Sequence, residues 1–72
     1  MIKAKTYTIN NKNYVNPDEP IEKIISAAVI SKQNDKYAIW YTYSNVSIIG
    51  VMNYGGSPAE NANYTILVFY IE

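Results

Sequence analysis

Apolar and polar residues alternate along several stretches of this chain, and a period of two is typical of β-strands rather than helices. The stretch KYAIWYTY at 36–43 is the clearest, because aromatic and β-branched residues fill it. Short segments rich in asparagine or glycine separate the alternating stretches and indicate turns. The pattern therefore predicts strands over residues 2–9, 36–43, 46–52 and 64–71.

The segment Asn-Asn-Lys-Asn at 10–13 predicts a tight turn after the first strand, because asparagine tolerates the left-handed backbone that hairpins require. Tyr14 and Val15 then return as a short second strand. Pro17 ends that strand, because proline has no N–H to donate to a sheet.

Residues 17–32 fit two structures. In a helix, Asp18 would cap the N-terminus and most of the following isoleucines would fall on one face. In a strand, the β-branched residues from Ile24 onward would lead into a turn at 33–36. Ile30 lies off the helical stripe, so we favour a short turn or helical piece over 18–23 and a strand from residue 24.

Two short turns predict how the central strands pair. A loop at Asn34-Asp35 places Val29 opposite Trp40, and a loop at Ser44-Asn45 places Trp40 opposite Ile49. Directly opposite residues share one face of a sheet, so this register assigns every side chain to a face.

Both faces of the resulting sheet are apolar. One face carries Ala28, Ile30, Tyr37, Ile39, Tyr41, Tyr43, Val46, Ile48 and Met52. The other carries Ile25, Ala27, Val29, Ala38, Trp40, Ile49 and Val51. A small antiparallel sheet normally keeps one wet face, so the uncovered face here indicates an interaction surface. The predicted partner-binding residues are Tyr37, Ile39, Tyr41, Tyr43, Ile48 and Met52.

These elements predict a single mainly β domain over residues 1–72. About five antiparallel strands would form a small curled sheet or barrel, and an α+β arrangement with one short helix is the alternative.

Composition removes most catalytic chemistry. The chain has no histidine, cysteine or arginine, so the commonest general base, thiolate nucleophiles and guanidinium clamps are all missing. The acidic residues Asp18, Glu19 and Glu22 suit the start of a helix better than a cation site. We therefore expect no enzyme activity, no catalytic residue, no metal and no cofactor.

A chain of this size has a marginal core, and without cysteine or histidine it has neither disulfides nor imidazole metal sites to reinforce it. Association with a second copy or with another protein is the reinforcement that remains. We expect a non-enzymatic protein-binding or self-assembling module with a regulatory, inhibitory or assembly role.

The alternative is a module that binds single-stranded nucleic acid by stacking bases on tyrosine and tryptophan. Six lysines balance six acidic residues, so the chain has no net charge to attract nucleic acid or an anionic membrane. No apolar segment has the length of a signal sequence or a membrane span, so we expect a cytoplasmic protein that does not bind membranes. The codon bias of the residues used suits an A/T-rich genome, viral genomes included.

Overall fold

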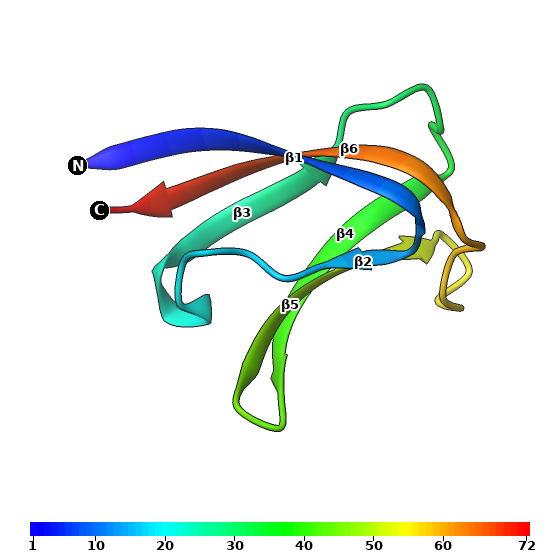
Figure 1. Cartoon of the computed structure of the whole chain (residues 1–72). Helices are drawn as coiled ribbons and strands as arrows, with labels where there is room; N and C mark the ends of the chain where they lie inside the picture. The colour runs from blue at the N-terminus through cyan, green and yellow to red at the C-terminus, as the bar shows by residue number, and fades with distance from the viewer.

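The computed structural model describes all 72 residues, and its secondary structure is almost entirely β (Figure 1). The elements are β1 (Ile2–Lys12), β2 (Tyr14–Val15), a single 3₁₀ turn η1 (Ile21–Lys23), β3 (Ile24–Val29), β4 (Lys36–Tyr43), β5 (Val46–Asn53) and β6 (Ala62–Ile71). The predicted mainly β class is confirmed. The structure contains no helix long and apolar enough to cross a membrane.

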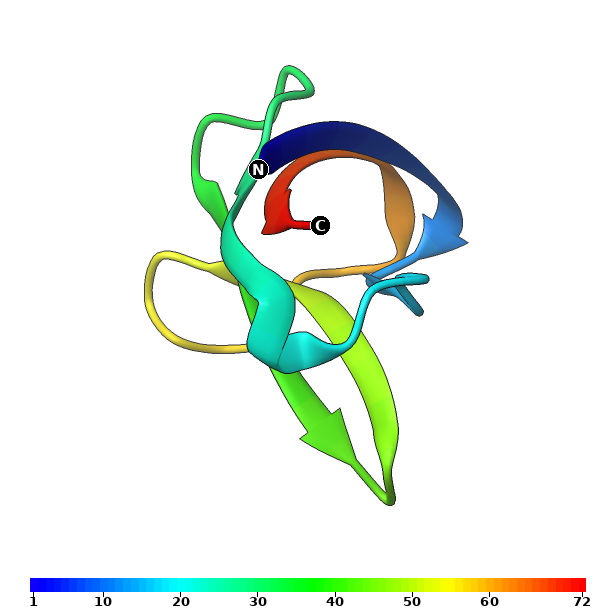
Figure 2. The same cartoon turned by 90° about the vertical axis from the view of Figure 1, so that its left-hand side faces the viewer.

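The strands form two antiparallel sheets, with orders β1-β6-β3 and β2-β5-β4. Figures 1 and 2 show the sheets curling around a common interior, with the end of β1 leading into β2. The neighbouring edge strands β3 and β4 are not hydrogen-bonded to each other. The fold is therefore a pair of small curled sheets and not a closed barrel.

The ambiguous segment follows the favoured prediction. Residues 21–23 form η1 and residues 24–29 form β3, so the longer helix is wrong. Pro20 precedes η1 and makes no side-chain capping bond, and Asp18 does not cap it either. β-Branched side chains lose rotamer freedom in a helix, whereas in β3 they pack against the sheet.

The acidic residues before η1 bind β1 instead. Lys5 Nζ lies 2.9 Å from Asp18 Oδ2 and 3.0 Å from Glu19 Oε2. Tyr7 donates its hydroxyl hydrogen to Glu19 Oε1 at 2.8 Å and accepts the backbone N–H of Asp18 at 2.9 Å. The bonds to Asp18 and then Glu19 raise the pKa of the Lys5 ammonium. This cluster fixes the connection between β2 and η1 to β1, on the face of β1 that also carries the buried Ile9.

The predicted hairpin through Asn34-Asp35 is wrong. β3 pairs with β6, so Val29 lies opposite Ile66 and not opposite Trp40. β6 is the central strand of its sheet, and its inward residues are fully buried, so it requires a neighbour on both sides. The backbone N–H of Ile30 continues this pairing with a 2.9 Å bond to Thr65 O. Ala28 and Ile39 therefore lie in different sheets, whereas the prediction placed them on the same face of one sheet.

The return of the chain at 14–15 is also paired differently. β1 continues to Lys12 through a register shift after Ile9, and Asn11 adopts the left-handed backbone with φ 56°. β2 exists as predicted, but it pairs with β5 rather than β1, with Val15 opposite Ile49. The asparagine-rich segment therefore moves the chain from one sheet to the other.

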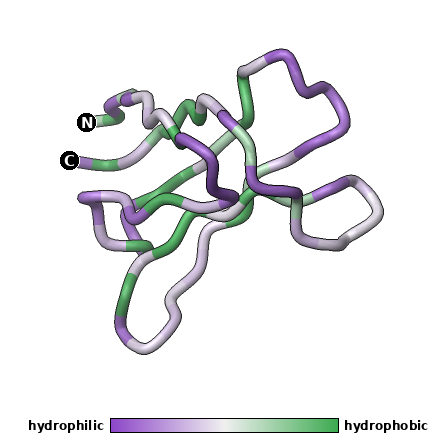
Figure 3. Tube along the Cα trace, turned by 45° about the vertical axis from the view of Figure 1, so that its right-hand side comes forward, coloured by the Kyte–Doolittle hydropathy of each residue, from purple (hydrophilic) through white to green (hydrophobic).

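The core lies between the two sheets and settles which face is covered. Its nine buried hydrophobic residues are Ile9, Ile24, Ala38, Ile49, Val51, Ala59, Tyr64, Ile66 and Val68. Figure 3 shows apolar residues concentrated along the sheets and hydrophilic residues in the loop between β3 and β4. The face of β4 and β5 that carries Trp40 and Ile49 is therefore the inner face, and the tyrosine-rich face points outward.

Candidate functional site

The β4–β5 hairpin presents the outward face. Ser44 and Asn45 have φ of 49° and 65°, and positive φ at both loop positions gives a turn whose twist matches its strands. The pairing is uninterrupted, from Lys36 opposite Asn53 to Tyr43 opposite Val46. The register predicted for this hairpin is confirmed. In Figures 1 and 2 its tip extends beyond the rest of the molecule.

A groove of about 290 Å³ opens on this outward face. It is lined by Asn13, Tyr14, Ile39, Tyr41, Ile48, Gly50, Val51, Met52 and Pro58. We call it the Gly50 groove.

The groove exists because Gly50 has no side chain. Gly50 lies in the central strand β5, between Tyr14 on β2 and Ile39 on β4. A Cβ atom added at Gly50 would lie 3.6 Å from Ile39 Cγ1 and 3.6 Å from Tyr41 Cε1, which is ordinary van der Waals contact. Tyr14 and Tyr41 flank this position, and each remains 42% exposed. The site is thus an apolar hollow between two half-exposed phenol rings.

Four of the six predicted partner-binding residues lie together in this groove: Ile39, Tyr41, Ile48 and Met52. The other two lie outside it. The Tyr37 ring stacks on Tyr54 with centroids 5.9 Å apart, and Tyr43 lies exposed at the hairpin tip.

Sequence reasoning missed Tyr14, Gly50 and Pro58. A glycine inside a strand pattern signals a bulge or a close approach, so Gly50 carried a usable signal. Tyr14 and Pro58 reach the groove because they pair with residues far away in the sequence, and no local sequence signal predicts such pairing.

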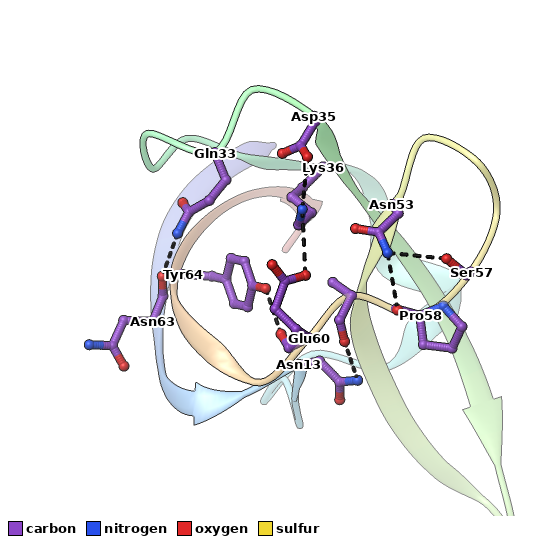
Figure 4. Close-up of polar contacts among 11 residues, drawn as sticks. Asn13, Gln33, Asp35, Lys36, Asn53, Ser57, Pro58, Glu60, Asn63 and Tyr64 are labelled. Carbon is purple, nitrogen blue, oxygen red and sulfur yellow. Dashed lines mark hydrogen bonds and ion pairs between the residues drawn. The ribbon is translucent and has the colours of Figure 1, made fainter.

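Side-chain amides hold the loop that brings Pro58 to the groove (Figure 4). Asn53 Nδ2 donates to Ser57 Oγ at 3.1 Å and to Pro58 O at 3.3 Å. Asn13 Nδ2 donates to Ala59 O at 2.9 Å, which links the same loop to the start of β2. These hydrogen bonds hold this side of the groove in place.

A buried lysine lies at the base of β4, away from the groove. Lys36 is 8% exposed, and its Nζ lies 3.0 Å from Asp35 Oδ2 and 3.5 Å from Glu60 Oε1 (Figure 4). The bond to Asp35 raises the pKa of Lys36 and lowers that of Asp35. Lys36 therefore stays protonated at neutral pH, and its charge is compensated within the fold.

No histidine, cysteine, aspartate or glutamate residues gather in a group of three or more that could hold a metal ion. The groove itself is lined by apolar, tyrosine and asparagine side chains, with no lysine and no carboxylate. The Lys12 Nζ lies 5.6 Å from the centroid of the Tyr14 ring, which is one of the rings lining the groove. The groove therefore presents a mainly apolar surface.

Substituting Gly50 with alanine is expected to stabilise the fold. Glycine within a strand costs about 0.5–1 kcal/mol relative to alanine, and the added methyl group would have room. Urea denaturation should show a higher midpoint with an unchanged slope. A lower midpoint would mean that Ile39 and Tyr41 cannot accommodate the methyl group.

No protein-family model matches this chain, and neither does any curated protein or solved structure. Its function is therefore inferred from the groove and the surrounding sheet.

Proposed function

We propose that this protein binds another protein without catalysing a reaction, and that the Gly50 groove receives an apolar or aromatic side chain of that partner. The observation that supports this most directly is the missing side chain at Gly50, in the centre of an uncovered sheet face. Tyr14 and Tyr41 on either side have large apolar rings with polar hydroxyls, and such residues dominate binding energy in protein interfaces.

The charge distribution defines the kind of segment that would bind. No ionised side chain lines the groove, and the chain has a formal net charge of zero. An acidic or basic peptide would gain little there, whereas an uncharged segment with one bulky apolar residue would bury it. Binding should depend weakly on salt, because screening acts on charge pairs. By occupying its partner in this way, the protein would act as a regulator, an inhibitor or an assembly factor.

Base stacking has less support from the same geometry. Trp40 points toward the core and only Lys12 lies near the groove tyrosines, so no lysine track accompanies an aromatic platform.

The test uses Gly50→Leu, which fills the groove, and Gly55→Leu, which adds the same atoms where nothing lies within 4 Å of the new Cβ. Random peptides displayed on phage would be selected on the unmodified protein, and the enriched peptides labelled for fluorescence anisotropy. We expect Gly50→Leu to weaken binding by about tenfold or more, equivalent to about 1.4 kcal/mol, and Gly55→Leu to leave it unchanged.

Equal affinity of the enriched peptides for both variants would overturn the proposal. So would salt-sensitive binding of a labelled oligothymidylate that displaces those peptides, because it would assign the groove to nucleic acid.

A further inference from the structure

The edge of β4 that faces away from β5 has no hydrogen-bonded partner strand. β4 pairs only with β5, and β3, its neighbour across the opening between the sheets, pairs elsewhere. None of the backbone hydrogen bonds outside the regular strands involves a group of Tyr37–Tyr43.

The hairpin geometry identifies the free groups. Tyr43 and Val46 flank a two-residue loop, so they form a hydrogen-bonded pair, and every second residue back along β4 also bonds to β5. The N–H and C=O groups of the intervening residues Ala38, Trp40 and Thr42 therefore point to the free side. They form the ladder that another strand would need.

A shallow hollow of about 340 Å³ lies along this edge, lined by the four consecutive residues 37–40. Successive side chains in a strand point to opposite faces, so four consecutive residues line one hollow only where it opens on the strand's edge. The hollow therefore opens on the edge of β4 at residues 37–40, beside β3, and the protruding tip leaves the second half of the strand exposed.

The other three edges carry features that block pairing, and β4 does not. Natural sheets protect their edges with lysines, bulges or very short strands. β1 carries Lys3 and Lys5, β3 has a bulge between Ile24 and Ser26, and β2 is two residues long. From Tyr37 to Tyr43, β4 has no charge, no proline and no bulge.

We propose that a second copy of this chain pairs with this protein through β4, antiparallel and edge to edge, so that two three-stranded sheets become one of six strands. A two-fold axis at Trp40 would place Ala38 opposite Thr42 of the second copy, which matches free donors with free acceptors in both directions.

The side chains along β4 and the zero net charge of the chain favour a second copy as the partner of this edge. In that register Tyr37 faces Tyr43 of the second copy and Ile39 faces its Tyr41, and such aromatic and β-branched pairs stabilise antiparallel strands. The chain has no net charge, so two copies do not repel each other at long range. The pairing goes beyond the proposed function: it leaves the Gly50 groove open and brings the grooves of both copies onto one face.

The test uses Thr42, which is exposed and whose N–H points to the free side. Thr42→Pro removes that N–H without removing a bond to β5, Thr42→Lys adds a charge at the edge, and Thr42→Val is the matched control. Sedimentation equilibrium of the full chain over a concentration series should show the mass rising from 8.2 kDa toward twice that value. We expect Thr42→Pro and Thr42→Lys to weaken dimerisation by about tenfold or more and Thr42→Val to leave it unchanged.

Amide exchange gives a second readout, since the Trp40 and Thr42 N–H groups should exchange more slowly with solvent at concentrations where the dimer forms.

A protein that stays monomeric at high concentration, or variants that dimerise like the unmodified protein, would overturn the proposal. Gly50→Leu should still dimerise, and Thr42→Pro should still bind the selected peptides, so each proposal can fail alone. Loss of the dimer in Gly50→Leu but not in Thr42→Pro would assign the contact to the groove and overturn edge pairing.

Discussion

Replacing Ile49 with alanine is expected to unfold a large share of the molecules, whereas the same change at its neighbour Ile48 should leave the fold intact. Ile49 is 0% exposed and lies between Val15 and Trp40 in the inner face of its sheet. Removing a fully buried isoleucine side chain costs about 2–5 kcal/mol, because contacts are lost and a cavity remains. Ile48 faces the Gly50 groove and retains contact with solvent.

The cost at Ile49 is large compared with the whole stability of so small a domain. A chain of this length is stabilised by about 4–11 kcal/mol, and a small core without disulfides lies toward the lower end. Urea denaturation followed by the fluorescence of Trp40, the single tryptophan, would measure both variants. Similar losses at the two positions would contradict the assignment of inner and outer faces.

The part of the fold that could be predicted from the sequence is the part set by neighbouring residues. The β4–β5 hairpin needs only a turn that accepts positive φ, at Ser44 and Asn45, and two strands with matching alternation. The break between η1 and β3 is equally local, because it depends on Pro20 and on the β-branched run that follows. The hairpin agrees with the structure to within one residue, and β3 begins at residue 24 as predicted, although η1 occupies only the last three residues of the predicted 18–23 piece.

The pairing of β3 could not be predicted in the same way. Asn34-Asp35 has the composition of a hairpin turn, yet Gln33 Nε2 donates to Asn63 O at 3.1 Å and helps to hold this loop against β6. The choice between β4 and β6 depends on which arrangement buries Ile66 and Val68, and that comparison involves the whole chain.

In the candidate site, too, the features set by neighbouring residues could be predicted and those set by distant parts of the chain could not. Strand alternation placed Ile39, Tyr41, Ile48 and Met52 on one face without knowledge of the fold. It could not show which face was covered, because both are apolar and the cover comes from the other sheet. It also could not show the groove, because a hollow depends on Gly50 together with β2, which arrives from a distant part of the chain.

Alkaline pH is expected to unfold this protein, with Tyr64 as a principal cause. Tyr64 is 1% exposed, and its hydroxyl donates to Glu60 O at 2.6 Å. Burial raises the pKa of the phenol, and the nearby carboxylate of Glu60 adds to the effect. The pKa of Tyr7 is raised as well, again mainly by burial. The folded protein therefore keeps these phenol protons at a pH where the unfolded chain has lost them.

The number of protons bound by the folded and unfolded states determines whether stability rises or falls with pH. Above the ordinary tyrosine pKa of about 10, the unfolded chain binds fewer protons than the folded protein, so the free energy of unfolding falls as pH rises through the folded-state pKa. Below that range this contribution is fully present. Urea midpoints measured from neutral to strongly alkaline pH should therefore decline, and phenolate absorbance should rise in step with unfolding.

Tyr64→Phe separates this contribution from other alkaline effects. At neutral pH the variant should lose about 1 kcal/mol with its hydrogen bond, but its stability should then fall less steeply with pH than that of the unmodified protein. Tyr43→Phe is the matched control, because Tyr43 is exposed at the hairpin tip and the substitution removes no buried hydroxyl group. An equally steep decline in Tyr64→Phe would show that alkaline unfolding begins elsewhere. The ion pairs of Lys5 would then be the next group to test, because deprotonation of Lys5 would break them and also lower the stability as pH rises.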